Sequence, residues 1–485
     1  MTINRRGGLL AAVCLAVLAA AAGPAPAETL AEAIASAYES NPSLQAQRAG
    51  QRALDENWVQ ARVGYRPTLS ASVQPFWQET QAGKAGGGAI SRLNTGSASF
   101  SFTQPIFTGG RTAAAVSQAE ADILAGRENL RRAEAQVIGQ VIQTYVDVRR
   151  DQAALEIRRE DLKVLQRQLE ESKARFEVGE ITRTDVAQSE ARLAASRALV
   201  QQATGQLAIS RSVYLQTVGR NPGDLAPPPT LDDLIPGTID QAFDVAERDN
   251  AQIRAAQYTE RSSRAQVDGV RALRMPRVSL QGSVGYSGTV EPFHAEKYAR
   301  NNTASAVITM PLFSGGAVSS EIRQALERNN VSRIGVETTR RGVIQLLTQS
   351  WSSLIAAREN ITSNEEQVRA AMIAAEGVHQ EQQVGLRTTL DVLNAEQELR
   401  FAQISLNSAV HDAYVASAGV LSQLGRLQAD YLIPNTPRYD PRANFGKLRI
   451  TWGWTPWEEV IAPIDSLLTS KVKERPLDKP QAALK

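Results

Sequence analysis

Residues 103–111 read TQPIFTGGR, and residues 309–317 read TMPLFSGGA. Other segments match at nearly the same spacing: RPTLSASV (66–73) with MPRVSLQGSV (275–284), and FEVGEITRTDVAQSE (176–190) with QQVGLRTTLDVLNAE (382–396). Self-similarity at a fixed spacing is typical of a duplicated structural unit. The chain therefore contains two copies of a unit of about 200 residues.

The duplication divides the chain into segments. The stretch RNPGDLAPPPTLDDLIPG is rich in proline and lacks periodicity, as a connection between units does. We predict a leader (1–27), a first repeat (28–219), a linker (220–237), a second repeat (238–427) and a tail (428–485) whose end is disordered.

The first 27 residues have the pattern of a secretory signal peptide. Arg5 and Arg6 precede an apolar run, and Ala25-Pro26-Ala27 offers a small-residue cleavage site. The only cysteine, Cys14, lies inside this segment, and a lipid anchor on it is disfavoured because the apolar run continues past it. We expect export from the cytoplasm and a mature chain without disulfides.

The charge balance argues against nucleic-acid binding, and the histidine content argues against a metal-dependent enzyme. The chain has 53 basic and 51 acidic residues, so nothing favours nucleic acid as a partner. The three histidines, His294, His379 and His411, do not have metal-ligand spacing, and we expect all three to be solvated. We therefore predict neither an enzyme nor a bound metal or cofactor.

Two long stretches predict helices. No proline occurs between Pro105 and Pro222 or between Pro311 and Pro434, and strong helix formers dominate both stretches. An apolar file recurs every seven residues, at Val141, Val148, Leu155, Leu162, Leu169 and Phe176, and again at Leu347, Leu354, Ile361 and Val368, before it weakens to Ala375 and Gln382. This period predicts supercoiled helices, and residues 112–178 alone would form a rod of about 100 Å.

Each helical stretch reverses at a short turn, VGEITRTDV (178–186) in the first repeat and VGLRTTLDV (384–392) in the second. Gly179 and Gly385 suit the left-handed residue that ends a helix. Thr182 and Thr388 are placed to cap the next helix, with Asp185 and Asp391 three residues on. We predict one antiparallel helical hairpin in each repeat.

Four shorter segments alternate apolar and polar residues, at about 66–78, 95–107, 275–288 and 301–313. This alternation predicts strands, and it matches the lipid-facing and water-facing sides of an outer-membrane β-barrel. A soluble sheet is the alternative. Aromatic residues lie near the strand ends: Phe76, Trp77, Phe107, Phe293, Tyr298 and Phe313.

The repeated phrase is interpreted as a strand-to-helix joint. Pro105 and Pro311 are expected to close the last strand of each repeat, because proline cannot extend a ladder. The pairs Gly109-Gly110 and Gly315-Gly316 then bend the chain into the long helix. Four strands cannot close a barrel, so two, three or four copies would have to pool about 8, 12 or 16 strands.

Together, the duplication, the joints and the turns resemble the TolC-type outer-membrane channels of type I secretion and multidrug efflux. The resemblance covers the mature chain to about residue 430, and residues 29–49 and 219–225 look more like the secretion branch. It implies a homotrimer with a 12-stranded barrel in outer-membrane lipid, continued by a periplasmic helical barrel. The partners implied are a periplasmic adaptor and an inner-membrane transporter, which would supply the energy.

The resemblance also implies roles for the hairpin tips. Arg387 matches the family's latch arginine, Asp185 its carboxylate partner, and Asp391 an aspartate that narrows the entrance. Gln382 replaces the latch tyrosine and Asn394 replaces a second ring aspartate, which implies a looser latch and half the ring charge. Adaptor docking is expected at Val178, Gly179, Thr182, Thr184, Val384, Gly385, Thr388 and Thr389. The simpler alternative is that Asp185 and Asp391 only cap helices and that Arg387 is solvated.

A periplasmic coiled-coil scaffold or adaptor is the rival interpretation. It would explain the export signal and the hairpins, but it would not need four alternating strands. The tail adds a tryptophan group, Trp452, Trp454 and Trp457, which would either pack on the helices or contact a partner.

Overall fold

A computed structural model of the chain describes residues 27–83, 88–289, 298–434, 436–451 and 455–466. The predicted leader, Phe293, His294, Trp452, Trp454 and the end of the tail lie outside these residues, apart from Ala27 of the leader. The described residues form two compact units: those within 27–44, 134–246 and 345–437 make the first, and those within 45–133, 247–344 and 438–466 make the second.

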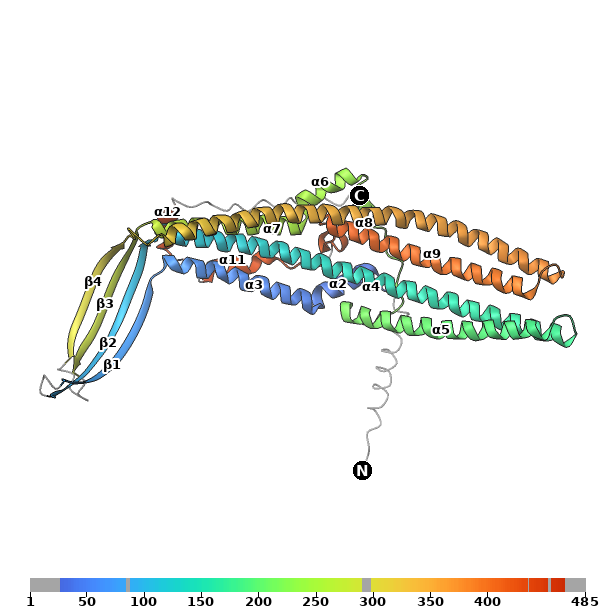
Figure 1. Ribbon diagram of the computed structural model, residues 1–485, viewed down its shortest axis with the longest axis horizontal. Coiled ribbons are helices and arrows are strands. Elements are labelled where there is room, and N and C mark those ends of the chain that lie inside the picture. Colours follow the sequence, from blue (N-terminus) through green and yellow to red (C-terminus); the bar gives the residue numbers. More distant parts are fainter. Residues whose placement is uncertain (1–26, 84–87, 290–297, 435, 452–454, 467–485) are drawn as a thin grey trace, which may run out of the picture. The chain divides into compact units, whose positions relative to one another are not determined.

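The elements repeat in order, as the duplication predicts (Figure 1). In the first repeat they are α2 (Leu30–Ser40), α3 (Pro42–Arg62), η1 (Val63–Tyr65), β1 (Thr68–Gln81), β2 (Ile90–Phe107), α4 (Arg111–Glu177) and α5 (Arg183–Val218). After η3 (Asp232–Leu234), the second repeat has α6 (Ile239–Asp249), α7 (Ala251–Arg271), η4 (Ala272–Arg274), β3 (Arg277–Thr289), β4 (Tyr298–Thr309), α8 (Ala317–Gln383) and α9 (Thr389–Gln423). The tail adds α10 (Ala429–Leu432), α11 (Pro441–Thr451) and α12 (Glu458–Asp465).

The second unit contains one antiparallel sheet in the order β1-β2-β3-β4. Its register places Leu69 opposite Phe102 and Ala71 opposite Phe100, so apolar side chains share one face. On the other face hydroxyls pair across the strands, as between Ser70 and Ser101, whose Oγ atoms are 2.7 Å apart. The predicted alternation is therefore confirmed for the described strands.

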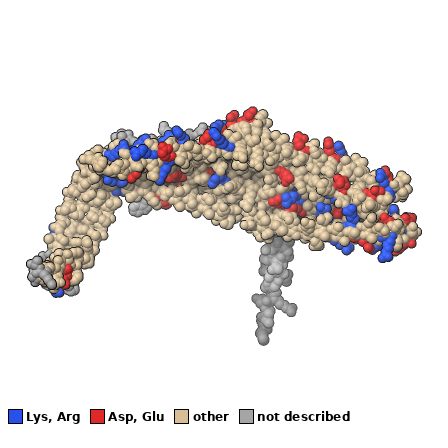
Figure 2. Space-filling view, in the orientation of Figure 1, with Lys and Arg blue, Asp and Glu red and all other residues tan. Residues whose placement is uncertain are grey.

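The apolar face of the sheet is exposed in the single chain. Leu69 is 78% exposed, Val73 79%, Phe100 71% and Ile308 71%. On the side visible in Figure 2, charged side chains gather over the helices, and the sheet shows almost only uncharged residues along its length. A large exposed apolar surface marks a contact with another apolar partner, because water disfavours it.

The first proline does not close its strand as expected, although β2 ends at the predicted residue 107. β2 continues through Pro105 to Phe107, with a shift of register against β3 between these two residues. Proline is tolerated there because an irregular register does not require its missing N–H. In the second repeat β4 ends at Thr309, short of the predicted 313, so Phe313 lies outside the strand.

Most of the apolar residues that recur every seven positions pack inward in the first unit. Val141 and Val148 are fully buried, as is Leu347, while Leu354 is 2% exposed. Phe176, predicted to belong to the file, is instead 44% exposed, because α4 ends one residue later. Among the described residues, no helix is both long and apolar enough to cross a membrane.

The linker is tied to the residue that follows the predicted leader. Glu28 forms a parallel bridge with Leu225. The hydroxyl of buried Tyr145 lies 2.8 Å from the Glu28 carbonyl oxygen and 2.7 Å from that of Ala226. Tyr214 donates to the Glu28 carboxylate at 2.6 Å. These contacts fix the connection between the repeats on α4 and α5.

Candidate functional site: tips and junctions of the helical hairpins

Both hairpin turns have the predicted caps. Gly179 and Gly385 have φ values of +82° and +79°, in the left-handed region. At the first tip the Thr182 N–H donates to Asp185 Oδ2 at 2.9 Å, and the Asp185 N–H donates to Thr182 Oγ1 at 3.3 Å. Thr388 and Asp391 repeat this capping box at 2.9 and 3.2 Å. The capping prediction is confirmed at both tips.

The tips present mostly exposed side chains. Val178 is 72% exposed and Val384 71%, and Leu386, which sequence reasoning did not single out, is 76% exposed. Thr184 is exposed, whereas Thr389 is buried at 6%. A partner could therefore reach all the predicted docking positions except Thr389.

No hydrogen bond or ion pair joins the predicted latch residues Arg387 and Asp185 in the described part of the chain. Arg387 Nε donates to Glu381 Oε2 at 2.7 Å, and both side chains are about half exposed. This hydrogen bond and the charge of Glu381 raise the pKa of Arg387. In the described part of the chain, Asp185 bonds to Thr182 in its helix cap and to Ser189 within the helix, and these bonds do not include Arg387. The pairing of Arg387 with Asp185 stays a prediction.

The electrostatics of Asp391 follow from its cap. The backbone N–H of Thr388, then its hydroxyl, and finally the charge of Arg387 hold the pKa of Asp391 below its usual range. Asp391 is therefore ionised at neutral pH and carries a negative charge at the tip. Gln382, in contrast, is 4% exposed, and its Oε1 has no hydrogen-bond partner in the described part of the chain.

A contact between the hairpins escaped the sequence reasoning. Arg192 on α5 donates to Asn394 Oδ1 at 3.1 Å and to Gln397 Oε1 at 2.6 Å, both on α9. Nearby, Leu165, Leu193 and Leu393 form one buried apolar cluster. The predicted constriction residue Asn394 thus takes part in a direct bond between the two hairpins. No local pattern around Arg192 could have indicated a partner 202 positions away.

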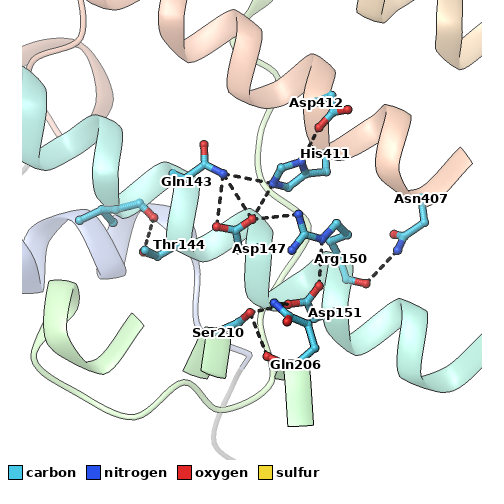
Figure 3. A network of polar contacts seen from close by, with 11 residues as sticks. Gln143, Thr144, Asp147, Arg150, Asp151, Gln206, Ser210, Asn407, His411 and Asp412 are labelled. Atoms are coloured by element: carbon cyan, nitrogen blue, oxygen red, sulfur yellow. Dashed lines mark hydrogen bonds and ion pairs between the residues drawn. The ribbon is translucent and has the colours of Figure 1, made fainter. Parts of the chain in front are cut away.

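A second junction lies where α4, α5 and α9 meet, and Figure 3 shows its polar side chains pointing toward one another. His411 Nε2 is 2.8 Å from Asp147 Oδ1, and His411 Nδ1 is 2.8 Å from Asp412 Oδ1. Arg150 bridges Asp147 and Asp151 at 3.2 and 2.9 Å. The network therefore links α9 to α4.

The same network reaches α5 and continues to the backbone. Ser210 donates to the Asp151 carboxylate, and Gln206 Nε2 lies 3.4 Å from it. Asn407 donates to the Arg150 carbonyl oxygen at 2.8 Å. Three helices are thus held by one chain of charged and polar groups (Figure 3).

His411 corrects the expectation that the histidines are solvated, because it is only 8% exposed. Burial lowers its pKa, but the hydrogen bonds to Asp147 and Asp412 outweigh burial and raise the pKa above 6.5. The neutral ring can donate only one hydrogen bond, whereas the charged ring donates two. Two flanking carboxylates therefore favour the imidazolium.

Comparisons with known proteins agree with this architecture. The chain matches the family described as "Outer membrane efflux protein" over residues 33–217 and 243–426. It is 33% identical to the outer membrane efflux protein BepC of Brucella suis, over 91% of this chain and 95% of that protein. It is 24% identical to the outer membrane protein TolC of Escherichia coli, over 84% of each chain.

The fold is also similar to solved structures. The crystal structure of the Campylobacter jejuni CmeC outer membrane channel superimposes with a TM-score of 0.73 at 14% identity. The match covers 87% of this chain and 89% of that one. At this identity the likeness shows the fold alone.

Proposed function

The chain belongs to the outer membrane efflux protein family, and we propose that three copies of it join into one duct for secreted proteins, small toxic compounds or both. The protein lies in the outer membrane of a Gram-negative cell and acts as an exit channel. The resemblance of residues 29–49 to the secretion branch favours a protein cargo. Passage is passive, so the energy comes from a partner.

The observation that carries the proposal is the sheet. Its apolar face is exposed, its opposite face carries hydroxyls, and among the described strands β1 and β4 each pair with a single neighbour. An open sheet edge is unfavourable in lipid, because its backbone groups have no partners there. Three copies with four strands each would close one barrel of 12 strands, with lipid outside and water inside.

The helical hairpins supply the periplasmic end. An inner-membrane transporter and a periplasmic adaptor dock at the tips, where Val178, Val384 and Leu386 are exposed. Apolar side chains at the tip of a water-facing helix are costly in the free protein. An adaptor that covers them gains that free energy on docking.

The closed entrance is held by several weak contacts. Arg192 joins α5 to Asn394 on α9, and in the assembled ring Arg387 exchanges Glu381 for Asp185 of a hairpin beside it. The ionised Asp391 of each copy narrows the entrance and favours cations. Exposed ion pairs contribute about 0–1 kcal/mol each, so a transporter can open such a gate.

The rival scaffold interpretation is not favoured. A periplasmic scaffold has no partner for the apolar side chains of the sheet, of which Leu69, Val73 and Phe100 are more than two-thirds exposed. An outer-membrane location covers them with lipid.

Single-channel conductance in a planar bilayer tests the function. We expect the wild-type trimer to give a small, mostly closed conductance, and Arg387→Ser to raise the open fraction sharply. Arg341→Ser is the matched control, because Arg341 also forms an exposed pair with a glutamate, Glu337, at 2.8 Å. A wide-open wild type would remove the latch from the proposal, and a folded trimer without conductance would refute the channel.

A further inference from the structure

The short helix α12 bonds to the chain on both sides of the β1–β2 hairpin, just before β1 and just after β2. Its Glu458 is fully buried and pairs with Arg62 and with Arg66, whose Nε lies 2.6 Å from Glu458 Oε1. Its Asp465 is also fully buried and accepts from the Thr108 N–H at 2.8 Å and the Gly110 N–H at 3.0 Å. One end of α12 is thus fixed before β1, and the other after β2.

In the part of the chain that the structure describes, the outer side of α12 is exposed and carries the charged Glu459 beside a stripe of apolar side chains. Trp457 is 44% exposed, Val460 67% and Ile464 47%, whereas Ile461 on the inner side is 7% exposed. The spacing places the three exposed side chains along one stripe of the helix. Such a stripe on a helix held rigidly by two buried carboxylates indicates a surface that another apolar surface covers.

The second joint offers a matching surface. Leu312 is 90% exposed and Phe313 91%, and Met310 just before them is 53% exposed. A Cβ built on Gly315 or Gly316 would meet nothing within 4 Å, so the turn itself is open. Among the described residues, no helix covers this second joint as α12 covers the first.

The strand order places these two surfaces next to each other in an assembly. The sheet runs β1-β2-β3-β4, so a ring of copies closes when β4 of one copy pairs with β1 of the next. The second joint directly follows β4, and α12 contacts η1, which directly precedes β1. Closing the ring therefore brings the second joint of one copy to α12 of its neighbour.

We infer that α12 is a clamp between copies of this chain: its stripe of Trp457, Val460 and Ile464 covers Leu312 and Phe313 of the adjacent copy. This inference rests on the proposed ring of copies. The tail, which lies outside the duplication, would then cover the second joint, which is exposed in the single chain. Each copy thus holds its own first joint and its neighbour's second joint.

Cross-linking of cysteine variants tests the clamp. Val460→Cys chains and Leu312→Cys chains are given different tags, expressed together and treated in membranes with a short bismaleimide. We expect a cross-linked species that carries both tags, formed roughly tenfold more than in a control, because adjacent thiols react at high effective concentration. Phe313→Cys serves as a second reporter on the same joint, and the wild type treated alike accounts for Cys14.

The matched control replaces Leu312→Cys by Ile334→Cys on α8. Ile334 is similarly apolar and 63% exposed, but it lies about 25 Å further along the helix at about 1.5 Å per residue. The mass of the detergent-purified protein is measured in parallel. A trimer without the two-tag species overturns the clamp and leaves the proposed duct intact, and labelling of the stripe by lipid-soluble reagents would then identify lipid as its cover. A monomer in every detergent overturns the duct itself.

Discussion

The two strand-to-helix joints share a sequence pattern and differ in their surroundings. Gly109 and Gly110 have φ values of +72° and +88°, and Gly315 and Gly316 have +60° and +85°, so the same turn forms twice. The first joint is buried, and the Asp465 carboxylate accepts its N–H groups. The second joint is exposed over its whole length.

The turn of the joint is determined by its own residues, whereas its cover is not. The glycine pair determines the turn, because other residues rarely adopt a positive φ. The cover comes from α12 in the tail, which the duplication did not copy. A duplicated unit can therefore keep its backbone while one repeat acquires a partner within its own chain that the other repeat lacks.

We expect the largest loss of stability when the bonds between α12 and the first joint are removed. Asp465→Ala would leave buried N–H groups at residues 108, 110 and 113 without their acceptor. Hydrogen bonds to a charged group contribute about 1.5–3 kcal/mol each, and we expect a combined loss of about 3–5 kcal/mol. Hydrogen exchange of residues 108–113, followed by mass spectrometry, measures the loss of protection.

The second joint is the internal control for this variant. Exchange at residues 314–319 should change less, because the proposed role of α12 there is apolar cover and Glu458 still holds the helix in the variant. Asp465→Asn should give an intermediate loss, because the amide keeps one acceptor oxygen. Wild-type protection of residues 108–113 in Asp465→Ala would show that the carboxylate does not hold the joint.

A matched pair of glycine variants gives the next largest effect. Gly109→Ala and Gly315→Ala both force an alanine to a positive φ, at a cost of about 1–2 kcal/mol. In Gly109→Ala the new Cβ would also lie 2.5 Å from Met275 Cβ and 3.1 Å from the Ala272 carbonyl oxygen. We expect Gly109→Ala to lower the melting temperature clearly more than Gly315→Ala, and equal shifts would contradict the difference in crowding.

Local patterns predicted the repeated parts of the fold well. Alternation indicated the strands, the heptad file the long helices, and Thr182 with Asp185 the capping box, because each depends on neighbours in sequence. Pro105 was misplaced as a strand end because only the pairing with β3 reveals the shift of register that accommodates it.

Contacts between distant residues could not be predicted in this way. His411 meets Asp147 across 264 positions, and Asp465 meets Thr108 across 357. Neither pair belongs to a repeated motif, so nothing in the sequence links its members. The proposed gating residues would depend in addition on contacts between copies, which the pattern of one chain does not contain.

The polar junction extends the comparison of the repeats to the helices. At the repeat spacing of 206, the counterparts of His411, Asp147 and Arg150 are Gly205, Ser353 and Ala356. The second repeat of the described chain therefore lacks the counterparts of these three residues. His411→Gln removes its charge, and we expect a loss of about 2 kcal/mol at low pH.

The pH dependence of this junction has a definite sign. Because folding raises the pKa of His411 above 6.5, its contribution is complete below pH 6.5 and is lost as the pH rises through the raised value. Asp147 stays ionised throughout, since its pKa is lowered. Thermal unfolding across this range should show the dependence in the wild type and in His379→Gln, a control outside the network, but not in His411→Gln. A pH dependence that persists in His411→Gln would exclude this histidine as its source.

We expect the smallest loss of stability at the helix caps of the tips, where the two repeats have the same structure. Thr182→Ala and Thr388→Ala each remove one N-cap, and the two caps have the same partners and almost the same distances. Each loss should therefore be about 1 kcal/mol, and the two should match within error. Hydrogen exchange in the first turns of α5 and α9 measures them separately. The cap geometry alone predicts equal losses of stability in the two variants. A larger loss in Thr388→Ala would therefore show that this tip, beside Arg387, stabilises more than α9 alone.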